Sequence, residues 1–454
     1  MERTPEHPAA HQRPVQLHHP CLRQVAGERV VKFYFPDSQD LVSPTYDFIN
    51  DEYLPTRVRQ RDDVYAHEAV TPSPYDGILV SKAIVDGSMK GAGKYPAPQR
   101  ARLYRLGVRK FFRLPPDTAS LGDCGAFNYA EEEYPPYSVD EVLDFYDECG
   151  FDSGVSIDHV IFGYLPEAGE DAVDPAWAKR RHISLDLAEK FLAAVQSRGS
   201  LVEPVGAAQG WSPASYTDSV ARLQEMGYRR IALGGMVPLK THEILACLEE
   251  ISTVLQAETQ LHLLGITRVE SMERFAGLGV TSFDSTSAFR QSFMDDRNNY
   301  HTEDGAYTAV RVPQVDGNPA LKRAILSGAV SQRDAILAER ECLSALRGYD
   351  QGVVDLEHVM TALAAYEALV LGDNQTKKKS YLVQYRRTLE ARPWKYCPCA
   401  LCEKHGVEIV IFRGTERNKR RGFHNLAVLE AKMRKVAPRP VRGETAPSTR
   451  RESG

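Results

Sequence analysis

Short apolar runs alternate with longer amphipathic segments between about residues 30 and 290 of the chain. The runs are about four to eight residues long and lie between glycines, prolines and polar residues, which is typical of strands buried on both faces. The intervening segments repeat their apolar residues at helical spacing. The runs that we predict to be strands are Val31–Phe35, Gly77–Ser81, Lys110–Leu114, Val155–Ile161, Leu201–Ala208, Arg230–Met236, Leu261–Ile266 and Ser282–Ser285.

The amphipathic segments also carry signals for helix ends. Ser138 opens one segment and Ser184 another, and serine readily accepts a hydrogen bond from a helix N-terminus. Gly199, Gly227 and Gly279 follow the last apolar positions of three segments, as expected of C-terminal glycines. Eight strands with helices between them predict an α/β fold, a (β/α)8 TIM-like barrel. The alternative is an open doubly wound sheet, which is less favoured because no G-x-G-x-x-G follows the first run.

The composition is that of a folded protein outside the membrane. The 454 residues are 43% apolar and 26% charged, with a net charge of -5, which is ordinary for a globular protein. No window reaches the roughly 18 apolar residues of a membrane helix. The polar, proline-rich N-terminus lacks the apolar core of a secretion signal. We therefore expect a cytoplasmic protein without a membrane partner, and a disordered leader over residues 1–29.

The remaining chain predicts further parts after a barrel that spans residues 30–320. Residues 321–390 predict a helical insertion whose role the sequence leaves open, and residues 439–454 predict a disordered basic tail. Residues 391–438 predict a metal-binding subdomain with the last barrel helix. From Thr376 to Arg442 there are 18 Lys and Arg residues against 5 acidic ones. Such an excess suggests a polyanionic partner, although a solvated basic face is the alternative.

Polar residues and glycines recur where the predicted strands end. Asp123, Asp158 and Asp284 supply carboxylates, and Gln209 supplies a carboxamide. A single Asp at a strand end is typical of a helix cap, but recurrence on successive strands of a barrel favours one shared site. Paired carboxylates can act as nucleophile and general acid/base at a sugar anomeric carbon. No P-loop or G-x-S-x-G is present, which disfavours phosphoryl transfer and serine hydrolysis.

The ordered segments GDCGAFN, AAQG, IALGGMVPLK, LLGI and FDSTS resemble those of the tRNA-guanine transglycosylase superfamily. The opening FYFPDSQDLVSPTYDF is most similar to the DpdA branch, which exchanges guanine in DNA for a 7-deazaguanine base. The resemblance implies that Asp284 is the nucleophile, that Asp123 is the general base, and that the expelled guanine is replaced on the same sugar face. The base-binding residues that it implies are Asp158, Gln209, Gly234, Gly235, Met236, Leu264 and Gly265.

Two departures from the superfamily bear on the substrate. Lys240 stands where enzymes for an aminomethyl base carry a glutamate, and a lysine would repel an ammonium group. The neutral nitrile base preQ0 is therefore favoured, unless Lys240 faces solvent at a helix start. The segment after Asp284 has only Arg290 and Arg297 where tRNA enzymes have an arginine-rich loop. We predict DNA as the polymer, with tRNA as the alternative.

A third hypothesis is that the protein is a non-catalytic nucleic-acid-binding partner subunit. The presence of both Asp123 and Asp284 argues against it, because a protein that only binds needs neither carboxylate. A partner protein such as a helper ATPase is a further possibility that the sequence leaves open.

The basic segment contains three cysteines, Cys397, Cys399 and Cys402, which together span only six residues. Bunched thiols in a protein that is not secreted favour a metal, and tetrahedral zinc needs a fourth ligand. His405 and His424 both qualify. His424 matches the C-x-C-x2-C…H pattern of the superfamily, and we expect it at the start of the helical stretch FHNLAVLEAKMRKV. Four protein ligands leave no open position, so the Zn2+ is expected to be structural.

Overall fold

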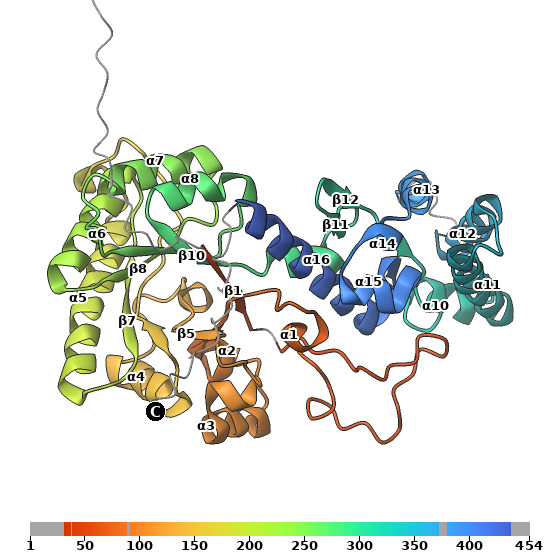
Figure 1. Cartoon of the computed structure of the whole chain (residues 1–454), viewed down its shortest axis with the longest axis horizontal. Helices are drawn as coiled ribbons and strands as arrows, with labels where there is room; N and C mark the ends of the chain where they lie inside the picture. Colours follow the sequence, from red (N-terminus) through yellow and green to blue (C-terminus); the bar gives the residue numbers. More distant parts are fainter. Residues whose placement is uncertain (1–30, 38, 89–90, 372–378, 437–454) are drawn as a thin grey trace, which may run out of the picture.

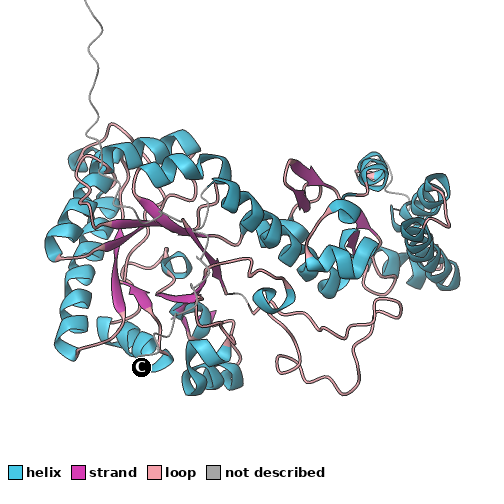
Figure 2. Ribbon diagram, in the orientation of Figure 1, coloured by secondary structure: helices cyan, strands magenta, loops and turns pink. Residues whose placement is uncertain are grey.

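Eight parallel strands close into a barrel in the spatial order β1-β10-β9-β8-β7-β6-β5-β2. The structure is a computed structural model that describes residues 31–37, 39–88, 91–371 and 379–436. Helices cover the outside of the barrel (Figures 1 and 2), so the predicted (β/α)8 fold is confirmed. The barrel strands are β1 (Lys32–Pro36), β2 (Gly77–Ser81), β5 (Ala119–Asp123), β6 (Ser153–Val155), β7 (Glu203–Ala208), β8 (Arg230–Leu233), β9 (Gln260–Leu263) and β10 (Val280–Asp284).

Helices of very different length connect and flank these strands. Two short hairpin strands, β3 (Gly87–Ser88) and β4 (Gly91–Ala92), lie between β2 and the next long helix. The helices of the barrel half are α1 (Ala66–Ala69), α2 (Lys82–Val85), α3 (Ala97–Phe111), α4 (Val139–Cys149), α5 (Pro175–Arg198), α6 (Pro213–Met226), α7 (Thr241–Ile251), α8 (Met272–Gly277) and α9 (Ser287–Met294).

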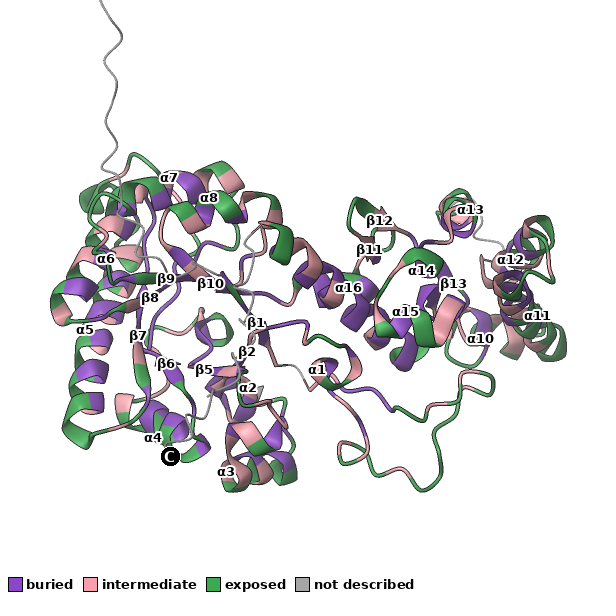
Figure 3. Cartoon of the chain, in the orientation of Figure 1, coloured by how far each residue is buried: buried purple, intermediate pink, exposed green. Residues whose placement is uncertain are grey.

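The apolar core has two layers, as a barrel requires. A small cluster fills the barrel interior, and Tyr34, Leu121 and Val205 belong to it. A much larger cluster packs between the strands and the surrounding helices. Figure 3 shows that the helices around the barrel are buried on the faces that point to the strands and exposed on their outward faces.

The predicted strand Lys110–Leu114 is wrong. Its first residues end helix α3, and the third barrel strand is Ala119–Asp123. Phe111 and Phe112 are apolar because they anchor the end of α3 against Tyr95 and Tyr65, not because they lie in a sheet. The true strand, ASLGD, contains small residues because Gly122 lies against the ring of Tyr146, where a Cβ would be 2.4 Å from the ring carbons.

Other boundaries differ in detail from the sequence expectation. Helix α5 begins at Pro175 with Asp174 as its N-cap, well before the expected Ser184, and it ends before Gly199 as predicted. Strand β6 ends at Val155, so the run to Ile161 is mostly loop. Ser138 does cap α4, accepting a hydrogen bond from the Glu141 backbone N–H.

Beyond the barrel the chain is mainly helical. The hairpin of β11 (Tyr300–Thr302) and β12 (Gly305–Tyr307) precedes the pair of β13 (Val310–Arg311) with β14 (Ile411–Phe412). The expected leader, residues 1–29, and the tail, 439–454, lie outside the described residues. The helices here are α10 (Pro319–Leu326), α11 (Gln332–Gln351), α12 (Leu356–Leu371), α13 (Leu382–Ala391), α14 (Pro393–Tyr396), α15 (Ala400–His405) and α16 (Gly414–Val436).

Helix α16 joins the barrel half to the C-terminal helices (Figure 1). It packs along α9, which directly follows the last barrel strand. The two helices approach closely at Gly422, where a Cβ would lie 2.4 Å from the ring of Phe289. Arg421 is fully buried beside this contact and donates to the Ser292 backbone oxygen at 2.6 Å. None of the helices in the described part of the chain has the length and apolarity needed to cross a bilayer.

Arginines of the basic segment hold a long loop of the N-terminal half, residues 39–65, against α16. The carboxylate of Asp51 accepts from Arg413 Nε at 2.6 Å and from the Arg417 guanidinium. Arg417 also donates to Glu408 Oε2 at 2.7 Å and to the Phe48 backbone oxygen at 2.8 Å. The charges of Arg413 and Arg417 are buried inside the protein, so they do not contribute to an exposed polyanion-binding face, whereas Arg387, Lys395 and Lys404 of the same segment are exposed.

Replacing Asp51 tests this network. Asp51→Ala removes the shared carboxylate of Arg413 and Arg417, which keep Glu339 and Glu408 respectively, so the loss is that of hydrogen bonds to a charged group, about 1.5–3 kcal/mol. We expect the free energy of unfolding to fall by this order in denaturant titrations. The neighbouring Glu52→Ala is the control, because Glu52 is exposed and surface substitutions usually change stability by less than about 0.5 kcal/mol. Equal stability of the two variants would contradict the interpretation.

Candidate active site and metal centre

The C-terminal ends of the barrel strands form one rim, and Asp123 is the last residue of β5 on it. Ser81 ends the neighbouring strand β2 in direct register with Asp123, and its hydroxyl donates to Asp123 Oδ2 at 2.7 Å. The pKa of Asp123 is raised to about 7, first by burial and then by the nearby charges of Asp158 and Asp284, while the Ser81 hydrogen bond opposes the rise. A carboxyl with such a pKa can both give and take a proton near neutral pH.

Asp158 and Gln209 form a hydrogen-bonded pair at the ends of β6 and β7. Gln209 Nε2 donates to Asp158 Oδ2 at 2.5 Å, and Gln209 Oε1 accepts from the Ile161 backbone N–H at 3.2 Å. Burial raises the pKa of Asp158 to about 6, and the Gln209 hydrogen bond opposes this rise. The Cys124 thiol lies 3.6 Å from the other oxygen, Asp158 Oδ1. The pair therefore presents a fixed set of donors and acceptors suited to the edge of a planar base.

Two glycines allow the backbone after β8 to approach this pair. A Cβ on Gly234 would lie 2.1 Å from Gln209 Nε2, so any side chain there would displace the amide. Gly235 has a φ of +74°, which other residues rarely adopt, and a Cβ on it would lie 2.3 Å from the Ile161 backbone oxygen. The glycine pair thus lets the backbone pack directly beside Asp158 and Gln209.

Asp284 ends β10 and is held by His262 of the adjacent strand β9 and by Gly265 just after that strand. Its Oδ1 lies 3.2 Å from His262 Nε2 and accepts from the Gly265 backbone N–H at 3.0 Å. Gly265 has a φ of +73°, which turns the backbone so that this N–H can reach the carboxylate. Leu264, before it, packs against the cluster that fills the barrel interior.

The other residues predicted for this site lie farther from the exposed part of the rim. Met236 is fully buried in the large apolar cluster, so its side chain is part of the core. Lys240 is exposed at the N-terminus of α7, where its backbone N–H donates to Glu243 Oε2 at 2.6 Å. This position agrees with the solvent-facing alternative for Lys240.

Three sets of residues at the rim were missed by sequence reasoning. Ser81 and His262 contact the two carboxylates, but only strand register reveals this. Phe127 and Phe162 form an exposed T-shaped pair, with ring centroids 5.5 Å apart, on the loops after β5 and β6. Their shared signal in the sequence is an aromatic residue shortly after a rim carboxylate, Phe127 after Asp123 and Phe162 after Asp158.

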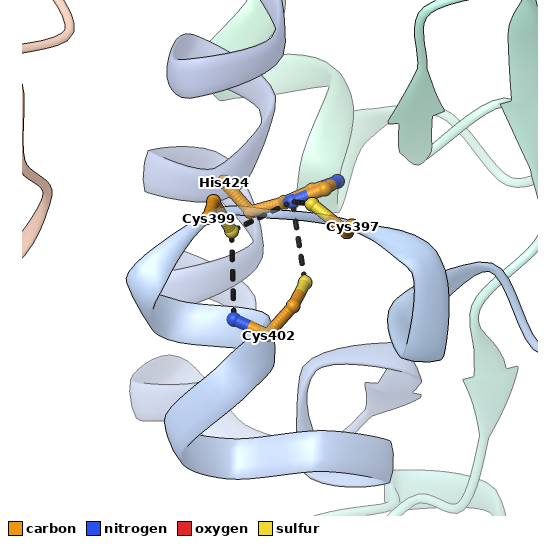
Figure 4. Close-up of side chains that lie close together, drawn as sticks. All are labelled: Cys397, Cys399, Cys402 and His424. Atoms are coloured by element: carbon orange, nitrogen blue, oxygen red, sulfur yellow. Dashed lines mark hydrogen bonds between the residues drawn. The ribbon is translucent and has the colours of Figure 1, made fainter.

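Three cysteines and one histidine form a compact cluster (Figure 4). The ligand atoms of Cys397, Cys399, Cys402 and His424 all lie within 4.8 Å of one another. His424 Nδ1 is 3.4 Å from the sulfurs of Cys399 and Cys402 and 3.5 Å from that of Cys397. This set of atoms could hold a metal ion.

Residues next to the cluster orient His424 and Cys402. His424 Nε2 lies 2.8 Å from the His301 backbone oxygen, and because a carbonyl only accepts, Nε2 carries the proton and Nδ1 presents its lone pair to the sulfurs. The Tyr300 hydroxyl lies 3.2 Å from Cys402 Sγ. The contacts therefore favour a ligand role for Nδ1.

The position of His424 differs from the expectation. It lies in the middle of α16, which begins at Gly414, because the preceding basic residues continue the helix through their buried contacts. His405, the other candidate ligand, lies outside the cluster, and its ring packs against Phe48 with centroids 5.2 Å apart.

Comparison with known proteins gives a relative over most of the chain. A DNA-guanine transglycosylase of Salmonella montevideo is 50% identical to it over 403 residues, which are 88% of this chain and 95% of the relative. No family model matches the chain. Identity at this level over this length, together with the barrel and its rim of carboxylates, shows that the chain is a glycosyltransferase of the DNA-guanine transglycosylase family, in the DpdA branch of the tRNA-guanine transglycosylase superfamily.

Proposed function

We propose that the protein exchanges guanine in DNA for the 7-deazaguanine base preQ0 through a covalent intermediate on Asp284. The observation that carries this proposal is the placement of Asp123 and Asp284 at one rim of the barrel, close enough for the charge of Asp284 to raise the pKa of Asp123. The name of the Salmonella relative, a DNA-guanine transglycosylase, supports the polymer and the expelled base.

The proposed reaction has two displacements at C1′ of the target nucleotide. In the first, Asp284 Oδ2 bonds to C1′ while the C1′–N9 bond breaks, and the departing guanine takes the proton of the Asp123 carboxyl. In the second, the Asp123 carboxylate removes the N9 proton of the incoming base. That base bonds to C1′ while the C1′–Oδ2 bond breaks and its electron pair returns to Asp284. Two inversions give net retention.

Asp158 and Gln209 are proposed to bind the pyrimidine-ring edge of guanine and of the incoming base. The Asp158 carboxylate accepts from base N–H groups, while the Gln209 amide can donate to a base oxygen. The backbone of Gly234 and Gly235 lies beside this edge, and Leu264 with Gly265 forms the floor. A base can reach these groups only outside the helical stack, so the target nucleotide must be flipped out of a duplex.

The preference for DNA over tRNA rests on the relative, whereas exposed charge near the rim would serve the phosphates of either polymer. Arg290 on α9 and Arg297 just beyond it are exposed and follow Asp284 in the chain. They are suited to contact phosphates on either side of the target nucleotide. The exposed position of Lys240 weakens the charge argument for a nitrile base, so preQ0 remains the proposed base on the resemblance to the family.

The cysteine–histidine cluster is proposed to hold structural Zn2+. Three sulfurs and one imidazole nitrogen are a preferred zinc donor set, and four protein donors leave no position for water or substrate. The ion would tie the Cys397–Cys402 segment to the middle of α16, which packs on the helix following Asp284. Free thiols at such a site are stable in a reducing compartment, which agrees with a cytoplasmic location.

Asp284→Ala tests the proposed nucleophile. Without a carboxylate at the end of β10, the variant should form no covalent adduct with DNA and should lose incorporation of labelled preQ0 by at least about 10³-fold. Label is followed separately in duplex DNA, single-stranded DNA and tRNA. Asp186→Ala, an exposed change on α5, is the control and should be fully active. Label in tRNA alone would overturn the proposed polymer, and exchange by Asp284→Ala would overturn the nucleophile.

The pKa of Asp123 predicts a pH dependence for the second displacement. Below about pH 7 the carboxyl is protonated and cannot take the proton of the incoming base, so resolution of a preformed adduct should rise with pH and level off above about 7. Asp123→Asn should slow this step by about 10²–10⁴-fold and remove the rise. The pH dependence is measured as the single-turnover rate of adduct resolution from pH 5 to 9. A midpoint near pH 4 in the wild-type protein would contradict the assignment.

Cys399→Ser tests the metal site. The wild-type protein should carry about one zinc ion per chain, and the variant should lose most of it and unfold at a lower temperature. Metal analysis by mass spectrometry and thermal melting provide the readouts. Cys342→Ser is the matched control, because Cys342 is buried in α11 outside the cluster. Unchanged zinc in Cys399→Ser would rule out the site.

A further inference from the structure

His262 is a buried histidine whose ring lies between two side chains of the neighbouring strand. Its Nε2 is 3.2 Å from Asp284 Oδ1, and its Nδ1 is 2.9 Å from the Ser282 hydroxyl. The backbone fixes this arrangement, because Ser282 and His262 are direct register partners and side chains two residues apart on a strand share a face. The side chain of His262 is 1% exposed and that of Asp284 is 8% exposed.

The hydrogen-bonding roles of the ring follow from its partners. An ionised carboxylate oxygen only accepts, so Nε2 must carry a proton. In the neutral ring Nδ1 is then an acceptor, and the Ser282 hydroxyl can donate to it. The edge of Tyr34 also packs against the imidazole, with ring centroids 5.7 Å apart. Serine, tyrosine and backbone thus hold His262 in one orientation.

Both donors to Asp284 reach the same oxygen. His262 Nε2 and the Gly265 backbone N–H each contact Oδ1. Among the residues that the structure describes, no hydrogen-bond donor reaches Oδ2. The two oxygens of the carboxylate are therefore unequal, with one bound to the protein and the other left for the substrate.

We propose that His262 is a positioning residue that holds Asp284 Oδ1, directs Oδ2 to C1′, and stabilises the carboxylate as it leaves in the second displacement. This inference rests on the proposed function. When the C1′–Oδ2 bond forms, the ester carbonyl resides on Oδ1 and its hydrogen bonds weaken. When that bond breaks, its electron pair returns to the carboxylate, and negative charge reappears on Oδ1 opposite the two N–H groups.

The two displacements respond differently to this contact. Donors on Oδ1 make Asp284 a weaker nucleophile but a better leaving group, so their loss should mainly slow resolution of the adduct. A side chain that merely packs the barrel would instead change the fraction of folded protein and leave the rate per adduct unaltered. The ratio of the rate of adduct resolution to the rate of adduct formation is therefore the informative quantity.

The experiment compares His262→Leu with His262→Gln. Glutamine can place an N–H near the position of Nε2, whereas leucine cannot donate. Adduct is formed on guanine-containing duplex DNA and isolated, and its resolution by added preQ0 is timed in a single turnover. We expect His262→Leu to resolve adduct about 10- to 100-fold more slowly, the effect of one hydrogen bond to a charged group. His262→Gln should recover to within a few-fold of wild type.

The control is His67→Gln, a histidine of α1 whose ring contacts the Tyr75 hydroxyl at 2.7 Å, and its rates should match wild type. Wild-type resolution rates in His262→Leu would overturn the inference, as would equal slowing in the leucine and glutamine variants. If His262→Leu does not fold, Ser282→Ala decides, because loss of the hydroxyl should slow resolution several-fold and an unchanged rate overturns the inference. Failure of wild-type protein to form any adduct would instead overturn the proposed function.

Discussion

Closure of a parallel sheet places the carboxyl end of every strand on one rim, and in this protein three of those ends bring Asp123, Asp158 and Asp284 together. β5 and β6 are adjacent in the barrel, so the first two carboxyls are forced close to each other in partly enclosed surroundings. Burial then makes ionisation of both carboxyls costly, and the charges of Asp158 and Asp284 add to this cost for Asp123. The pKa values of Asp123 and Asp158, about 7 and 6, follow from the topology rather than from any single partner. The barrel thereby creates an acid/base group suited to neutral pH, while donors from β9 hold Asp284 separately.

The fold was predictable because its signals are local and repeated. Apolar runs bounded by glycine or proline marked six of the strands and only the last residue of a seventh, β6, and capping residues such as Ser138 marked helix ends. The third strand was misplaced because ASLGD owes its small residues to the close packing of Tyr146 on Gly122, whereas the bulkier KFFRL belongs to a helix end. An apolar run shows that a segment is buried, but it does not show whether strand or helix buries it.

The candidate site was predictable to the extent that each residue follows its own strand. The carboxylates, Gln209 and the glycines belong to segments that can be recognised singly, and the barrel topology brings them together. Ser81 and His262 could not be found in this way, since each matters only through the register that aligns it with Asp123 or Ser282 on the next strand. The position of His424 within α16 was likewise hidden, because helix length there depends on contacts with the loop of residues 39–65 and with α9.

The basic segment shows why sequence charge and surface charge can differ. Arg413, Arg417 and Arg420 are buried and face carboxylates of the protein itself, supplied in part by Asp51 in a distant loop. Arg421 is buried among backbone oxygens instead, and burial lowers its pKa to about 9. These guanidinium groups fix the C-terminal helices relative to the barrel, and a phosphate could reach them only by displacing their partners. Arg290 and Arg297, which follow the strand end that carries Asp284, and Lys395 and Lys404 of the basic segment itself are exposed instead, so the count of basic residues overstates the surface charge of this segment without removing it.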